Sequence, residues 1–152
     1  MLRGSPRQRI SKISEVRSRL RKDLFGYTHG IAVVNVFYEN VNRHRVEGRA
    51  LFADEAAENV LLEFKPRPTQ NMLVACLWSR WTAPGEPDLL SFAAITDEPP
   101  AEVAAVGHDP CLVPIRPEHV DAWLNPDPAA LAAQYAVLDD RARPFYEHRM
   151  AA

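Results

Sequence analysis

Apolar residues in this chain gather in short runs that are separated by polar stretches rich in proline. The first run, Ile31–Glu39 (IAVVNVFYE), is β-branched, aromatic and apolar nearly throughout, which predicts a buried, central strand. Four later runs of similar character predict further strands, and short connections favour antiparallel neighbours. These strands are expected at Asn59–Phe64, Asn71–Trp81, Leu89–Thr96 and Cys111–Ile115.

Helical spacing is confined to short segments. Apolar residues recur every three or four positions near the N-terminus, and Pro117 followed by Glu118 suits a helix start. Helices are therefore expected at Ser11–Phe25, Pro117–Leu124 and Pro128–Leu138, a long loop at Asn40–Glu58 and a turn at Lys65–Gln70. Together these elements predict an α+β fold, with a mainly antiparallel, strongly curved, barrel-like sheet and a few short helices.

Composition narrows the class of protein. The 152 residues suit one domain, expected at residues 23–152, and thirteen prolines favour many short elements. No apolar run approaches the roughly 20 residues of a membrane helix, and no secretory signal is recognisable. Cys76 and Cys111 form neither a disulfide framework nor a paired zinc spacing, so we expect two buried thiols in a reduced cytosolic protein.

Charge is distributed unevenly along the chain. Residues 1–22 carry eight basic side chains against one acid, a net +7, whereas the whole chain carries −2. The remaining residues therefore carry −9. A basic arm on an acidic body can bind phosphate backbones non-specifically. An equally acceptable interpretation is a solvated, disordered arm without a ligand.

Two titratable residues are candidates for chemistry. Glu39 ends the first apolar strand after two aromatic residues, where apolar surroundings favour a raised pKa and acid/base work. His108 lies between Gly107 and Asp109, in a loop between two predicted strands. A strand-end Glu that faces solvent and an ordinary loop His are the simpler alternatives, and sequence spacing does not show whether the two residues meet.

Other candidates are fewer and weaker. Arg43 and Arg45 in the polar loop could contact phosphate, and Trp78 could stack on a base. Trp81 lies three residues beyond Trp78, hence on the opposite face of a strand. No HExxH or CxxC spacing predicts a metal site, and no glycine-rich phosphate loop or dinucleotide fingerprint predicts a cofactor.

Three segments carry a family resemblance. IAVVNVFYE resembles the strand that ends in aromatic-aromatic-Glu in the SRAP family, the SOS response-associated peptidases or abasic-site-processing proteins. NMLVACLWSRW (Asn71–Trp81) is similar to that family's AGLW strand. Ser91–Leu124 (SFAAITDEPPAEVAAVGHDPCLVPIRPEHVDAWL) resembles its segment with TTEA, HDRMPVIL and a final WL. The order and spacing of these motifs extend the resemblance from Phe25 to the C-terminus.

The resemblance implies a compact, β-rich α+β fold with a groove for single-stranded DNA. In the family, an N-terminal Cys condenses with the ring-opened aldehyde of an abasic site and forms a thiazolidine crosslink, after autoproteolytic loss of the initiator Met. Carried over by motif, Glu39 matches the catalytic Glu that moves protons at the sugar and the amine. His108 matches the His that assists ring opening and crosslink release, and Thr96 matches a Thr near the DNA.

Departures from the family pattern are equally informative. The chain begins Met1-Leu2 rather than Met-Cys, and neither Cys76 nor Cys111 can close a thiazolidine with an α-amine. Pro110 stands where the family has an Arg after His-Asp, which removes a phosphate contact. The sequence is therefore expected to lack the family's N-terminal portion, and with it the covalent activity.

Two classes of function follow as alternatives. One is a DNA-crosslinking enzyme and autopeptidase of the SOS response, and the other is a non-catalytic remnant that binds single-stranded DNA or an inactive fragment. A missing N-terminal strand would expose a sheet edge and favour self-association. We expect a bacterial cytoplasmic location, at the nucleoid during repair, with no membrane partner and no cofactor.

Overall fold

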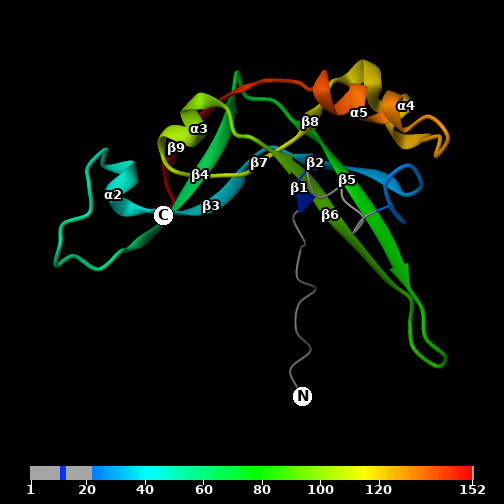
Figure 1. Cartoon of the computed structure of the whole chain (residues 1–152), viewed down its shortest axis with the longest axis horizontal. Helices are drawn as coiled ribbons and strands as arrows, with labels where there is room; N and C mark the ends of the chain where they lie inside the picture. Colours follow the sequence, from blue (N-terminus) through cyan, green and yellow to red (C-terminus); the bar gives the residue numbers. More distant parts are fainter. Residues whose placement is uncertain (1–10, 13–21, 152) are drawn as a thin grey trace. The chain divides into compact units, whose positions relative to one another are not determined.

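The computed structural model describes residues 11–12 and 22–151, which fall into two compact units, each with its own sheet (Figure 1). Unit 1 holds the described residues up to Val33 together with Leu73–Asp97 and Leu112–Ala142. Unit 2 holds the rest of the described chain, and its segments are Val34–Met72, Glu98–Cys111 and Arg143–Ala151. Each sheet is thus assembled from segments that are distant in the sequence.

The sheet of unit 1 is built on an antiparallel hairpin. Strands β5 (Met72–Trp81) and β6 (Leu89–Asp97) pair from Cys76 opposite Ala94 to Trp81 opposite Leu89. The strand order is β1-β6-β5-β2, with β1 parallel to β6 and β8 antiparallel to β5. The shorter strands are β1 (Ser11–Lys12), β2 (His29–Val34), β7 (Cys111–Leu112) and β8 (Pro114–Ile115).

The core of unit 1 lies between this sheet and short helices. A 3-10 turn, η2 (Pro117–His119), leads into α4 (Val120–Leu124), and α5 (Leu131–Asp139) follows. The buried cluster is apolar, which supplies the main driving force for folding of the unit. Its members are Phe25, Ala75, Leu77, Ile95, Val113, Ile115, Trp123, Val137 and Leu138.

His29 is buried beside this core. Its Nε2 accepts a hydrogen bond from the Gly26 N–H (2.8 Å), so Nδ1 carries the proton that it donates to the Trp123 carbonyl (2.9 Å). The imidazole stacks on the Trp123 ring with centroids 3.9 Å apart. Burial lowers the pKa of His29 to about 4, despite the bond to Trp123 that favours the charged form. The structure therefore requires a neutral His29.

This requirement predicts a loss of stability in mild acid. Unfolded His29 titrates near 6.5 and folded His29 near 4, so the unfolded state binds more protons between these values. The contribution of neutral His29 to the free energy of unfolding is complete above pH 6.5. It falls by about 1.4 kcal/mol per pH unit as the pH drops toward 4. Urea unfolding at pH 7.5 and pH 5 measures it. Between pH 7.5 and pH 5 the free energy of unfolding of His29→Gln should fall by roughly 2 kcal/mol less than that of the wild type. An equal fall in both proteins would contradict the assignment of His29 as a neutral, buried residue.

Unit 2 is a three-stranded antiparallel sheet with two short helices. The strand order is β3-β4-β9, and the strands are β3 (Phe37–Asn42), β4 (Asn59–Arg67) and β9 (Phe145–Met150) (Figure 1). Helix α2 (Arg43–Val46) continues directly from β3, and α3 (Ala101–Ala105) contacts β9. One face of the sheet is apolar and buried, and its residues include Phe37, Val41, Leu62, Phe64 and Tyr146.

The structure confirms the α+β class, the antiparallel sheets and the few short helices. In the described part of the chain neither sheet closes on itself, so the barrel-like core is not confirmed. The helix expected at Ser11–Phe25 falls largely on residues 13–21, outside the described residues. Ser11–Lys12 at its start is strand β1, and the described residues at its end form a turn.

The predicted central strand Ile31–Glu39 is wrong as a single element. The chain bends at Asn35, and the run divides into β2 and β3, which belong to different sheets. Each stands at the end of its strand order rather than at the centre. A uniformly apolar run can supply buried residues to two sheets as well as to one. Apolarity alone therefore did not show where the strand divides.

The turn predicted at Lys65–Gln70 is also wrong in its first residues. Strand β4 continues through Pro66, which lies opposite Tyr146 of β9. Strand β3 reaches only as far as Phe64, so Pro66 lies beyond the part of β4 that is paired on both sides. A proline is tolerated there because no second neighbour needs its missing N–H.

Three smaller differences complete the comparison. The loop expected at Asn40–Glu58 begins with the end of β3 and helix α2. The strand expected at Cys111–Ile115 is divided at Val113 into β7 and β8. The charged C-terminal segment, for which no strand was expected, contains β9.

Candidate functional site

Glu39 and His108 lie side by side in unit 2. Glu39 is on β3, opposite Leu62 of β4, and His108 follows α3 in the loop that leads to β7. The Glu39 Oε1 and His108 Nε2 atoms are 3.4 Å apart. The side chains are 27% and 12% exposed, so both are largely withdrawn from solvent. The fold therefore brings together the two residues whose meeting the sequence left open.

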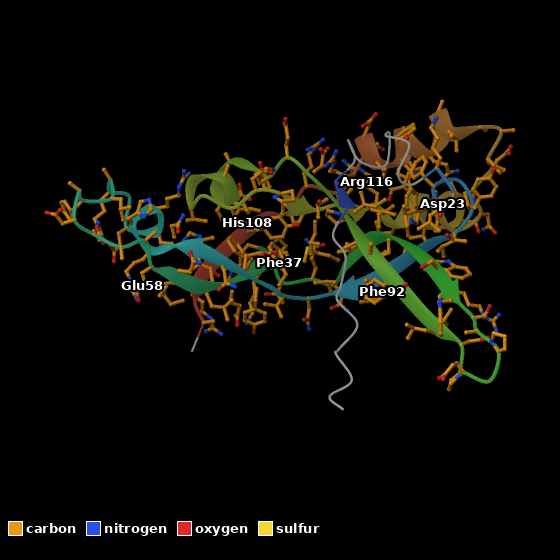
Figure 2. All side chains as sticks on the ribbon, turned by 60° about the horizontal axis from the view of Figure 1, so that its bottom comes forward. Asp23, Phe37, Glu58, Phe92, His108 and Arg116 are labelled. Carbon is orange, nitrogen blue, oxygen red and sulfur yellow. The ribbon has the colours of Figure 1, made fainter. Side chains whose placement is uncertain are left out.

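The sheet and one glycine hold this pair in place. Glu39 alternates with Phe37 and Val41 on β3, so its carboxylate lies on the apolar face of the sheet. Gly107 has a φ of +82°, a left-handed conformation that a residue without Cβ adopts easily, and it directs the chain into His108. The His108 ring lies 6.2 Å from the Phe64 ring between their centroids. Figure 2 labels His108 and Phe37 in this unit.

The pair is close enough for an ion pair but too long for a good hydrogen bond. A standard hydrogen bond to nitrogen spans roughly 2.7–3.2 Å, and Nε2 of His108 is buried without a hydrogen-bond partner among the described residues. A buried, unpartnered polar atom is costly in a purely structural role. The geometry places a group that can accept a proton next to a group that can donate one, and the His108 nitrogen has unused hydrogen-bonding capacity.

Arg43 and Arg45 stand at the end of the strand that carries Glu39. Arg43 donates two hydrogen bonds to the Glu58 carboxylate, from Nε (2.6 Å) and from one terminal nitrogen (3.2 Å). Arg45 is exposed, and its aliphatic stem lies against Gly107. The sequence analysis gave both arginines the same role, but their surroundings differ.

Thr96 and Trp78 belong to unit 1, so the DNA contacts predicted for them stay predictions. The Thr96 side chain is buried (1% exposed), and its hydroxyl has no hydrogen-bond partner among the described residues. The Trp78 side chain is 39% exposed, with its indole N–H donating to the His29 carbonyl (3.2 Å). An exposed aromatic edge on a fixed strand is compatible with base stacking.

Both thiols are buried, as the sequence predicted. Cys76 lies within β5, and burial raises its pKa to about 11. Cys111 at the start of β7 is 3% exposed. Neither thiol is accessible to solvent. Over residues 11–12 and 22–151, no group of three or more His, Cys, Asp or Glu side chains is arranged to hold a metal ion.

One polar cluster was missed by the sequence interpretation. On the opposite face of the unit 2 sheet, Glu63 accepts hydrogen bonds from the Tyr38 hydroxyl (2.8 Å) and the Arg149 Nε (3.0 Å), and the Lys65 ammonium lies 3.1 Å away. These partners, Tyr38 first, lower the pKa of Glu63 to about 2. The cluster joins β3, β4 and β9, and its role is to hold these strands together. It could not be predicted from the sequence because β9 was not predicted.

Comparison with known proteins identifies the family of this chain. The family model of the SOS response associated peptidases (SRAP) matches residues 9–150. The chain belongs to the SRAP family. No curated protein matches it. No helix in the described residues of this SRAP chain is long and apolar enough to cross a membrane.

Solved structures show the same fold at low sequence identity. A phage-related protein from Bordetella bronchiseptica matches with a TM-score of 0.66 at 18% identity, over 95% of this chain and 63% of that one. A protein from Bacteroides thetaiotaomicron matches with 0.68 at 12% identity, over 93% and 57%. A further Bordetella bronchiseptica protein matches with 0.66 at 12% identity, over 95% and 64%. The SRAP chain thus spans about three-fifths of the length of these structures.

Proposed function

We propose that this SRAP chain binds single-stranded DNA at abasic sites and that Glu39 and His108 catalyse opening of the abasic sugar. The observation that carries the proposal is the Glu39–His108 pair, 3.4 Å apart on the apolar face of the unit 2 sheet, with Nε2 unpartnered among the described residues. Membership of the SRAP family supports the DNA-directed role. The finer assignment rests on the chemistry of the two side chains.

Ring opening needs one proton acceptor and one proton donor. An abasic deoxyribose is a cyclic hemiacetal with a hydroxyl on C1′. Glu39 accepts the proton of that hydroxyl while His108 donates a proton to the ring oxygen O4′, and the C1′–O4′ bond breaks. The products are a C1′ aldehyde and a C4′ hydroxyl, with no net gain or loss of atoms. Proton return from Glu39 to His108 through solvent completes the cycle.

The aldehyde is then available for covalent capture. The thiazolidine that the family resemblance implies needs a thiol and an α-amine on the same residue. Cys76 and Cys111 lie within strands and are buried, so we propose that neither of them is the nucleophile. The pair thus prepares the electrophile, and a terminal aminothiol or an external amine completes the reaction.

A second candidate function is retention of single-stranded DNA without chemistry. It is favoured by the β5–β6 hairpin of unit 1, where Trp78, Trp81 and Phe92 are 39%, 54% and 47% exposed (Figure 2 labels Phe92). Exposed aromatic side chains bind bases by stacking, at about 1–3 kcal/mol per base. This function needs neither Glu39 nor His108.

Aldehyde trapping distinguishes the two candidates. A labelled single strand with one abasic site is incubated with an alkoxyamine, with and without the protein, and the oxime product is resolved on a denaturing gel. Acceleration by the protein supports ring opening. A strand with a tetrahydrofuran analogue, which has no aldehyde, should bind but yield no oxime. Binding without acceleration would favour retention alone, and absence of both would refute the DNA-directed function.

A further inference from the structure

We infer that Arg45 is the positioning residue that binds the backbone phosphate beside the abasic sugar. The inference rests on the proposed function, because it assigns the DNA contact that presents the sugar to Glu39 and His108. It concerns Arg45 alone among the arginines of α2 and the loop that follows. Packing and charge support it independently.

The side chain of Arg45 packs against Gly107. A Cβ built on Gly107 would lie 2.2 Å from Cδ and 3.2 Å from Nε of Arg45. Gly107 leaves this space open, and the Arg45 stem crosses the backbone of Gly107 directly before His108. Helix α2 continues directly from β3, which carries Glu39, so Arg45 is tied to the strand of Glu39 by the chain and to the residue before His108 by packing.

Arg45 differs from the neighbouring arginines in its ionic contacts. Arg43 is neutralised by Glu58, and Arg49 binds Glu47 (2.7 Å) and Glu55 (2.5 Å). Among the described residues no carboxylate lies within ion-pair distance of Arg45, which is exposed. The charge of Arg45 is therefore the one in this segment that remains available to an external anion.

The chemistry of guanidinium suits a phosphate. Its planar set of donors forms two parallel hydrogen bonds to phosphate oxygens, which adds orientation to attraction. A stem held against Gly107 loses less freedom on binding than a freely rotating one. The expected ligand is an internal phosphodiester of single-stranded DNA next to the abasic position.

Arg45→Ala tests the inference, with Arg49→Ala as a control that removes the same charge from the same segment. Binding to a strand with a tetrahydrofuran site is measured by fluorescence anisotropy at several salt concentrations. Arg45→Ala should weaken binding roughly five- to tenfold at low salt and reduce the salt slope by about 0.7. Arg45→Lys should restore most of the slope but less of the affinity, because it retains the charge without the planar donors. Arg49→Ala should match the wild type.

The outcomes separate this inference from the proposed function. Two results would overturn the role of Arg45 and leave the proposed function intact. One is that Arg45→Ala and Arg49→Ala weaken binding equally, and the other is that Arg45→Ala leaves the salt slope unchanged. A wild type that neither binds the strand nor accelerates trapping overturns both. The alkoxyamine assay adds a second readout, since Arg45→Ala should raise the DNA concentration for half-maximal trapping by the same factor as the dissociation constant.

Discussion

Glu39→Gln is expected to slow protein-dependent trapping of the abasic aldehyde by about a hundredfold or more, the usual range for loss of a general acid or base. Gln has nearly the same shape as Glu but cannot accept the C1′ hydroxyl proton. Its carboxamide still fits beside His108, 3.4 Å away in the wild type, so the fold and the DNA affinity should persist. The measurement is the initial rate of oxime formation at saturating protein.

Two comparisons make this result interpretable. Glu86→Gln changes the same functional group on an exposed loop of unit 1, and it should leave the trapping rate unchanged. Because Glu39 and His108 act on one bond, Glu39→Gln combined with His108→Gln should lose little more than either substitution alone. A Glu39→Gln protein that binds DNA and retains the wild-type rate would show that the pair has no part in ring opening.

Trp123→Ala is expected to give the largest loss of stability, about 3–5 kcal/mol for unit 1. The indole is completely buried, stacks on His29 and donates its N–H to the Gly30 carbonyl (2.9 Å). Truncation to Ala removes this packing, leaves a cavity and deprives the Gly30 carbonyl of its hydrogen-bond donor. Urea unfolding at pH 7.5, followed by circular dichroism, measures the change.

Leu124 provides the matched control, because it follows Trp123 directly and its side chain is 43% exposed. Leu124→Ala alters the same helix without opening the core, so its effect should remain within about 0.5 kcal/mol. If Trp123→Ala cost less than about 1 kcal/mol, the central place of the indole in the core of unit 1 would be wrong.

Several elements were predictable because their signals are local. Strands β5 and β6 begin where their apolar runs begin, and the helical segment at Pro117–Leu124 follows its proline and early acid. Strand β9 was not predictable, because its sequence FYEHRM is polar enough for a loop and is held by pairing with β4. Strand formation of this kind depends on a neighbour rather than on intrinsic propensity.

The candidate site divides in the same way. Glu39 and His108 could be selected from their residue types, their flanking residues and the resemblance of their segments to one family. Their approach could not be predicted, because it depends on how the loop after α3 returns to β3 across many intervening residues. The availability of Arg45 was equally hidden, since only the fold shows that Glu58 neutralises Arg43 and that Gly107 receives the Arg45 stem.

The amino-acid sequence by itself determined the α+β class, the main strands, the family and the two side chains with acid/base chemistry, because these follow from local patterns and motif order. Only the tertiary structure decided where the first apolar run divides, which strand covers the edge of β4, that His29 is a neutral core residue, and that Glu39 and His108 meet. The physical reason is that these features arise from contacts between distant segments, whose free energy depends on packing that no local pattern encodes.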